Sequence, residues 1–273
     1  MRILILGASG FVGSVLYRDL SARHSVVGTC WRAEIPGLRR VDLRDPVALA
    51  ALAAEGFDVV IHSAGVVDLG AAEADPDLAW TENVGSVETL VDAVTGTGTK
   101  LVLLSSDNVF DGVRESYTEA DPTCPVNVYG RTKVAAEQAL LAGGGHLAVR
   151  IPIVYGRSPW TDRFMSRFAR PETPAQTDVT CAPLYLDSLP AGLEALWDLT
   201  GVVHYAGPDV VTRFELMSRI QAALDLPTCV VPVRNDDAFA GYARPKRLVL
   251  RSIRHGFAGA RLDDALEDMS ASS

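Results

Sequence analysis

Tyr129 and Lys133, four residues apart, are the residues of this chain best suited to acid–base chemistry. The surrounding residues 126–141 have a helical pattern, and a spacing of four places both side chains on one face of a helix. An ammonium group near a phenol favours the phenolate, so we expect this tyrosine to exchange a proton near neutral pH. Because such pairs also occur on solvated helix faces, the interpretation depends on the rest of the chain.

A glycine-rich segment lies between the first apolar run, residues 2–6, and the helical pattern of residues 11–23. A strand, a tight glycine turn and a helix start form a site for phosphate, because free N–H groups and the helix dipole attract anions. The G-x-x-G-x-x-G spacing in this context predicts dinucleotide binding. To this site we assign Gly7, Ser9, Gly10, Phe11, Val12 and Gly13.

The residue after the second strand indicates which dinucleotide binds. An acid there would favour NAD, but this chain has Thr29 and then Arg32, with no acid before Glu34. An arginine can bind the 2′-phosphate of NADP, so we expect NADP. By position along the sheet, we also expect the cofactor to contact Asp42 and Leu43 at the adenine and Ser63, Ala64 and Gly65 further along.

Two serines and an aspartate, Ser105, Ser106 and Asp107, follow the apolar run of residues 100–104. In an open parallel sheet the carboxyl ends of the strands face the ligand crevice. A hydroxyl there can bind a carbonyl oxygen beside the tyrosine. Asp107 either positions substrate hydroxyls or caps the following turn, and both interpretations stay open.

Strands and helices alternate through the first half of the chain, which predicts an α/β fold with a doubly wound parallel sheet of Rossmann type. We expect residues 1–156 to form the NADP-binding domain, with later segments returning to it, and residues 157–273 to form mainly a substrate-binding lobe. Expected strands are 2–6, 25–29, 59–62, 100–104, 147–150 and 202–205, and expected helices are 11–23, 46–54, 78–94, 126–141, 186–199 and 212–224. Residues 230–266 are expected to be irregular.

Composition narrows the range of partners. The chain has 273 residues, is 48% hydrophobic and carries a net charge of −9, which argues against nucleic acid or an anionic membrane as the main partner. No apolar run approaches the ~20 residues of a membrane span. The four scattered cysteines predict neither a disulfide framework nor a metal site, and we expect a cytoplasmic protein. A homo-oligomer stays open.

Three motifs together resemble the extended short-chain dehydrogenase/reductase superfamily: the glycine loop, the run S-S-D-N-V-F-D-G at 105–112, and Tyr129 with Lys133. The run is similar to the S-T-D-x-V-F-D-G pattern of dTDP-4-dehydrorhamnose reductases. The resemblance continues through residues 150–156 and 201–207 and covers the chain to about residue 250.

The resemblance implies roles for these residues in the reduction of a ketone. Tyr129 would protonate the carbonyl oxygen, Lys133 would bind the nicotinamide ribose and lower the tyrosine pKa, and Ser106 would orient the carbonyl. It also implies that Pro152 and Ser105 lie against the cofactor. On the substrate side it implies Asp107, Asn108, Ile153 and Arg244. Arg244, with Lys246 and Arg247, either meets a phosphate of the substrate or forms a solvated loop.

The reductase pattern has a tyrosine where this chain has Asn108 and a tryptophan where it has Ile153. The run R-I-P-I-V-Y-G at 150–156 is more similar to the regulatory β subunit of methionine adenosyltransferase, which binds NADP as a partner subunit. Three functions therefore stay open: an NADPH-dependent ketoreductase acting on a nucleotide sugar or a related small metabolite, a noncatalytic NADP-binding subunit, and a sugar-nucleotide epimerase or dehydratase.

Overall fold

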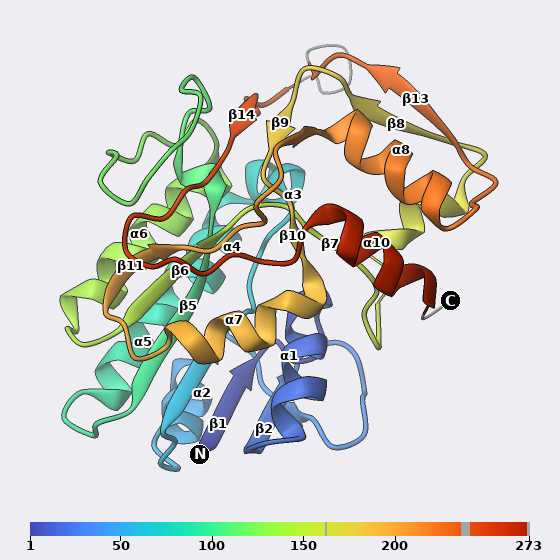
Figure 1. Cartoon of the computed structure of the whole chain (residues 1–273). Helices are drawn as coiled ribbons and strands as arrows, with labels where there is room; N and C mark the ends of the chain where they lie inside the picture. The colour runs from blue at the N-terminus through green and yellow to red at the C-terminus, as the bar shows by residue number, and fades with distance from the viewer. Residues whose placement is uncertain (162, 236–240, 272–273) are drawn as a thin grey trace.

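A seven-stranded sheet forms the centre of the computed structural model, which describes residues 1–161, 163–235 and 241–271 (Figure 1). The strand order is β11-β6-β5-β4-β1-β2-β3, and every neighbouring pair is parallel. From β1 the chain adds strands outward to β3, and from β4 it adds them in the opposite direction to β11. This change in the order of strand addition confirms the predicted doubly wound α/β fold. The strands are β1 Arg2–Leu6, β2 Ser25–Cys30, β3 Arg39–Arg40, β4 Val59–His62, β5 Lys100–Ser106, β6 Leu147–Ile151 and β11 Gly201–His204.

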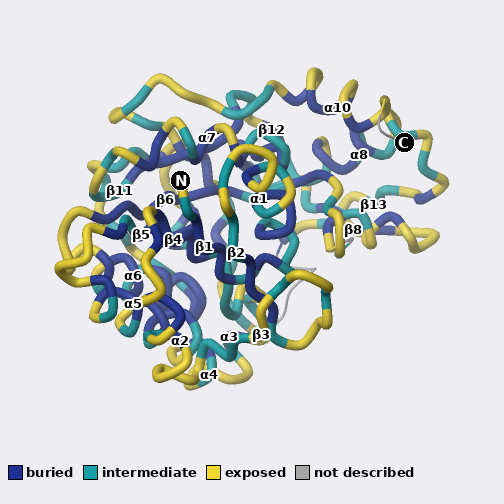
Figure 2. The backbone as a smooth tube through the Cα atoms, turned by 90° about the horizontal axis from the view of Figure 1, so that it is seen from below, coloured by how far each residue is buried: buried dark blue, intermediate teal, exposed yellow. Residues whose placement is uncertain are grey.

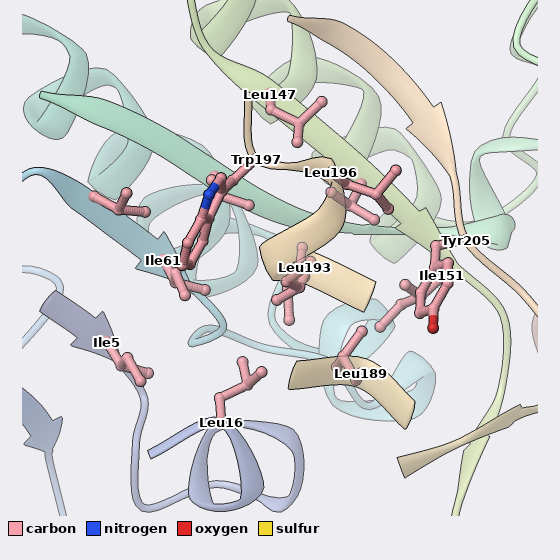
Figure 3. Packing of buried hydrophobic residues seen from close by; sticks show 14 of the residues in the cluster. Ile5, Leu16, Ile61, Leu147, Ile151, Leu189, Leu193, Leu196, Trp197 and Tyr205 are labelled. Atoms are coloured by element: carbon pink, nitrogen blue, oxygen red, sulfur yellow. The ribbon is translucent and has the colours of Figure 1, made fainter. Parts of the chain in front are cut away.

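Helices cover both faces of the sheet, because alternate residues of each strand point to opposite sides. Ile3 and Ile5 of β1 belong to one core, with α1 (Phe11–Ser21) and α7 (Leu189–Leu196). Figure 3 shows Ile5 in this core with Leu16 of α1 and Leu193 of α7. Leu4 and Leu6 belong to the other core, with helices α2 (Pro46–Ala53), α5 (Ser86–Val94) and α6 (Val128–Ala142). In Figure 2 the central strands are dark blue because both of their faces are covered.

The helix expected over residues 78–94 is in fact three segments. Asp75 caps α4 (Pro76–Trp80), a π-helical turn spans Thr81–Gly85, and α5 follows. The wide turn buries Asn83, whose Nδ2 donates to the backbone oxygen of Val66 and to Thr132 Oγ1, both at 2.9 Å. A regular apolar pattern does not reveal such a turn, because the extra residue changes the register by only one position.

The second lobe, at the upper right of Figure 1, is built from short elements around a core of its own. Strand β8 (Glu172–Gln176) pairs in parallel with β13 (Cys229–Val233), and helix α8 (Arg213–Ala223) packs beside them. The irregular stretch expected after residue 230 contains β13, β14 (Arg247–Leu248) and the start of α10 (Leu262–Ala271). The remaining elements are α3 Leu69–Ala74, β7 Val154–Tyr155, β9 Thr180–Cys181, β10 Leu184–Tyr185, β12 Val211–Thr212 and the 3-10 turns Asp107–Val109, Met165–Ala169 and Leu186–Ser188.

A buried ion pair attaches α6 to the sheet. Arg150 of β6 donates to both carboxylate oxygens of Glu137, at 2.9 and 2.7 Å, and Ser105 donates a third hydrogen bond to the same carboxylate. Arg150 also lies 5.1 Å from the centre of the Phe110 ring. Because both charged side chains are almost fully buried, each depends on the other for its charge balance.

We predict that Arg150→Met lowers the free energy of unfolding by about 3–5 kcal/mol, because it leaves the Glu137 carboxylate buried without a counter-charge. Urea denaturation followed by circular dichroism measures this loss. Arg131→Met, at an exposed site on the same helix, is the matched control, and Glu137→Leu combined with Arg150→Met should restore most of the stability. A loss below about 1 kcal/mol for the single variant would contradict the role of the pair.

Candidate active site

The glycine loop forms a tight turn between β1 and α1. Gly7 has φ +82°, in the left-handed region that glycine accepts without strain. A Cβ on Gly13 would lie 2.1 Å from the Gly7 oxygen, so only glycine lets α1 approach β1 this closely. Gly10 is the N-cap of α1, and no side-chain hydrogen bond caps this helix. The loop therefore has the shape and the free helix start that bind a pyrophosphate.

Basic side chains surround the end of β2, where the adenosine ribose of a dinucleotide is expected. Thr29 is buried and its Oγ1 accepts from the Gly7 N–H at 3.1 Å, while Arg32 is exposed. Arg40 and Arg44 lie 5.0 and 5.6 Å from the centre of the Trp31 ring. These two arginines and the tryptophan were missed in the sequence, because β3, which brings them to the loop, has only two residues.

Asp42 and Leu43 have different surroundings. The Asp42 carboxylate accepts from Arg44 Nε at 2.8 Å and Nη2 at 2.7 Å, and this pairing holds its pKa below the usual range. Leu43 packs against the core under α2 and α5. Asp42 thus keeps Arg44 beside Trp31, at the mouth of the expected adenosine site.

The loop after β4 passes beside the glycine turn. Ser63 Oγ donates to the Leu6 oxygen at 2.7 Å, and Ala64 would be in contact with any side chain at Gly7. Asn83 accepts from the N–H of Val66 at 2.8 Å and thereby fixes the loop from the other side. Ser63, Ala64 and Gly65 therefore form a fixed loop beside the glycine turn.

Ser106 and Tyr129 meet at the carboxyl end of the sheet. Strand β5 extends to Ser106, two residues further than expected, so Ser105 and Ser106 point to opposite sides. Ser105 faces Glu137, whereas the Ser106 hydroxyl is close enough to Tyr129 to influence the pKa of its phenol. Of the two serines, only Ser106 thus presents its hydroxyl to the tyrosine.

Burial raises the pKa of Tyr129 to about 12, although the Ser106 hydroxyl favours the phenolate. Lys133 is not among the groups that shift this pKa, so the expectation that Lys133 lowers it stays a prediction. Burial lowers the pKa of Lys133 itself to about 8. The tyrosine therefore holds its proton at neutral pH, as a proton donor must.

Asp107 is a buried carboxylate beside the serine. Its Oδ1 accepts from Ser106 Oγ at 3.1 Å and from Asn108 Nδ2 at 2.9 Å. Burial raises its pKa to about 6, against the opposing effects of Arg213 and these hydrogen bonds. Asp107 also begins a 3-10 turn, but the N-cap of that turn is Ser106, which accepts from the Asn108 N–H. The capping role weighed for Asp107 thus belongs to Ser106.

Helix α6 is held against this turn at its first residues. Asn127 caps α6 by accepting from the Gly130 N–H at 2.8 Å and donates to the Ala243 oxygen at 3.2 Å. A Cβ on Gly130 would lie 2.2 Å from the Asn108 oxygen, so the absence of a side chain lets the helix touch the turn. These contacts place Tyr129 next to Ser106.

The residues expected on the substrate side come from both lobes. Asn108 and Arg244 line one cleft together with Asp107 and Arg213, and Arg244 donates to the Tyr242 hydroxyl. Pro152 is buried after β6, and Ile153 packs against the core of the second lobe, as does Phe11 at the start of α1. Arg213, at the first position of α8, was missed because its helix is more than eighty residues from Tyr129 in the sequence.

The described residues contain no group of three or more side chains that would hold a metal ion. No helix among them is long and apolar enough to cross a membrane.

Comparison with known proteins identifies the family. A model of the RmlD substrate binding domain matches residues 1–261. The chain belongs to this family. It is 32% identical over 270 residues to the dTDP-4-dehydrorhamnose reductase of Mycolicibacterium smegmatis, covering 94% of this chain and 80% of the relative. It is 29% identical over 273 residues to methionine adenosyltransferase 2 subunit beta of Rattus norvegicus, covering 91% and 80%.

Solved structures agree on the fold of this RmlD-family chain. A dTDP-4-dehydrorhamnose reductase from Bacillus anthracis, in complex with NADP, superposes with a TM-score of 0.89 at 24% identity, covering 100% of this chain and 99% of the other. MoeE5 in complex with UDP-glucose and NAD superposes with a TM-score of 0.81 at 23% identity, covering 99% and 98%.

We predict that Asp107→Asn stabilises the protein above pH 6. The folded-state pKa of Asp107 is raised from 3.8 to about 6, so the folded chain binds this proton more tightly than the unfolded chain does. The free-energy cost of burying the charged carboxylate is absent below about pH 4, grows between pH 4 and 6, and reaches its full value above pH 6. Asparagine keeps both acceptor contacts without the charge, so the gain should reach about 1–2 kcal/mol at pH 7.5.

The measurement is thermal unfolding of both proteins from pH 4 to 8. The expected result is equal melting temperatures at the acidic end and a higher melting temperature for Asp107→Asn at the alkaline end. A difference that does not change with pH would contradict a raised carboxyl pKa.

Proposed function

We propose that the protein is an NADP-dependent oxidoreductase that reduces a keto group on a nucleotide-activated sugar. The observation that carries the proposal is the closeness of Ser106 to Tyr129, on the helix that also carries the buried Lys133 one turn further on. Membership of the RmlD family and the two reductase relatives support the same reaction class. A site that combines hydroxyl, phenol and ammonium groups suits hydride transfer to a carbonyl, because charge develops on the oxygen.

The residues present fit NADP. The glycine turn and the uncapped start of α1 would hold the pyrophosphate. Arg32 would bind the 2′-phosphate, and Trp31 with Arg40 and Arg44 would line the adenosine. Lys133, which is buried, would bind the nicotinamide ribose, and Pro152 would lie against the nicotinamide. When bound, NADPH supplies the hydride that becomes the new C–H bond and is itself oxidised to NADP⁺.

The protein residues supply the proton and the orientation. Ser106 donates a hydrogen bond to the carbonyl oxygen and holds it next to the Tyr129 hydroxyl. Tyr129, protonated at neutral pH, gives its proton to that oxygen as the charge develops, and the product is an alcohol. The positive charge of Lys133, one helical turn away, would favour the phenolate that remains. Asp107 accepts from sugar hydroxyls beside the reacting carbon.

A second candidate function is that of a noncatalytic NADP-binding subunit. The similarity to methionine adenosyltransferase 2 subunit beta favours it, and so do Asn108 and Ile153, which replace aromatic residues of the reductase pattern. The epimerase or dehydratase alternative would need a further acid–base pair beside Tyr129. Asp107 supplies one such carboxyl group, and among the residues that the structure describes no second one lines the same cleft.

We predict that the protein consumes NADPH in the presence of a dTDP-4-keto sugar and that Tyr129→Phe lowers kcat at least about 1000-fold, because the proton donor is lost. The measurement is the loss of NADPH absorbance with a panel of dTDP-4-keto sugars. Dissociation constants for NADPH should stay within about twofold of the wild type, because phenylalanine keeps the ring in place.

Tyr117→Phe is the matched control, since that tyrosine is buried but bonds to Asp111 outside the site. If Tyr129→Phe keeps its turnover, the proton donor to the carbonyl oxygen must be another group. If the wild type consumes no keto sugar and instead copurifies in a stoichiometric complex, the subunit function replaces the reductase.

We predict that the wild type binds NADPH far more tightly than NADH and that Arg32→Ala removes roughly tenfold of this preference, because a charge-assisted bond to the 2′-phosphate is lost. Fluorescence titration with both cofactors measures the ratio. Arg39→Ala is the control, because Arg39 is nearby but already paired with Glu55 at 2.5 Å. An equal loss of affinity for NADPH and NADH in Arg32→Ala would contradict the assignment of Arg32 to the 2′-phosphate.

A further inference from the structure

Side chains close the outer edge of the central sheet at β11. This strand pairs with β6 on one side and is the last strand of the sheet among the residues that the structure describes. In a parallel ladder, alternate residues direct their N–H and C=O groups to opposite sides. The N–H groups of Gly201 and Tyr205 bond to the chain of β6, so the polar backbone groups of Val202 and His204 face outward.

A segment after β14, residues 252–257, lies along this outward row of backbone groups, and we call it the strap. In Figure 1 the red chain passes beside β11 on its way from β14 to α10. Two side chains of the strap donate hydrogen bonds to three backbone oxygens at the edge: Arg254 Nη1 to Thr200 at 2.7 Å and Val202 at 2.8 Å, and His255 Nε2 to His204 at 2.8 Å. A Cβ on Gly201 would lie 3.1 Å from Arg254 Nη1, so the missing side chain leaves room for the guanidinium group.

A carboxylate from a distant part of the chain completes the attachment of the strap. Glu119 accepts from the outward N–H of His204 at 2.9 Å. The same carboxylate accepts from Ser252 Oγ at 2.6 Å and from the Ile253 N–H at 2.9 Å. One side chain thus satisfies the edge of β11 and holds the first residues of the strap.

The strap is attached mainly by these polar contacts, because its large apolar side chains remain outside the core. Ile253 is 65% exposed and Phe257 is 56% exposed. The chain is fixed on either side of the strap, since Leu250 and Leu262 are buried in hydrophobic clusters. Loss of the hydrogen bonds to β11 would therefore free the strap while its two ends stay in place.

The sequence of the covered strand favours pairing with another strand. Residues 200–206 read T-G-V-V-H-Y-A, with β-branched and aromatic side chains and no proline, lysine, arginine or acid. A segment of this composition with unpaired backbone groups is a template for the same segment of another molecule. Arg254 occupies the carbonyl oxygens that such a partner would need, and it places a positive charge at the edge, which also disfavours strand pairing.

We propose that the strap is an autoinhibitory contact that prevents the outer edge of β11 from pairing with β11 of a second copy of this chain. The pairing that it prevents is a twofold, edge-to-edge extension of the sheet, in which the same residues of both copies meet. This inference is independent of the proposed reaction. The glycine loop follows β1, and strands β4, β5 and β6 lie between β1 and β11.

Analytical ultracentrifugation of Arg254→Ala and the wild type at matched concentrations tests the proposal. We expect the variant to form species of at least about twice the wild-type mass, in amounts that increase with concentration. Hydrogen exchange followed by mass spectrometry should show slower exchange of the backbone amides of residues 200–206 in these species. Arg251→Ala is the matched control, because this exposed arginine donates to the Pro208 oxygen and should keep the wild-type mass when replaced.

Glu119→Gln releases the strap independently, because an amide nitrogen cannot accept a hydrogen bond from an N–H group. It replaces Arg254→Ala in the test if circular dichroism shows that Arg254→Ala is unfolded. A folded variant with the wild-type mass overturns the proposal. Association that leaves the exchange of residues 200–206 unchanged also overturns it, because another surface would then join the copies. Unfolding of both variants overturns it as well, because the contacts would then serve the fold itself.

Discussion

The buried contact between Glu137 and Arg150, joined by Ser105, is the interaction on which the candidate site depends. Tyr129, Lys133 and Glu137 lie at successive intervals of four and therefore on one side of α6. Glu137 is bonded to β6 and to β5, so the orientation of the helix about its own axis is set by the sheet. Rotation of α6 would break a buried ion pair, and this cost keeps the phenol of Tyr129 directed at Ser106.

The alternation of side chains along β5 divides the work between adjacent serines. Ser105 holds the helix, and Ser106 faces the side of Tyr129 in the candidate site. A shift of one residue in the strand would exchange these positions and separate the tyrosine from its partner hydroxyl. The geometry of the candidate site is thus a consequence of strand register, which the parallel pairing of β5 with β4 and β6 fixes.

Much of the first lobe was predictable, because its signals are local. The apolar runs of β1 and β4, the glycine turn and the helix of Tyr129 all arise from short-range patterns, and the structure confirms these elements. The contents of the substrate cleft were not predictable to the same degree. Arg213 comes from a helix that follows Thr212, and its closeness to Asp107 results from the packing of distant segments. The π turn at Asn83 was missed because it preserves the apolar pattern on both sides. The pKa of Tyr129 was expected to fall, since spacing shows charges but not burial.

The path of the chain through the central sheet has a consequence for the integrity of the molecule. Strands β7 and β8 of the second lobe precede α7 and β11 in the sequence. Helix α7 packs on one face of the central sheet and β11 pairs with β6, and the chain then continues into α8 of the second lobe. A cut after residue 156 would expose the edge of β6 and the apolar residues under α7. Segments of the two lobes therefore alternate along the chain, and neither lobe can be inherited, expressed or lost as an independent module. A change of substrate in such a protein has to arise by replacing residues in the cleft, because exchange of a whole lobe would dismantle the nucleotide-binding sheet.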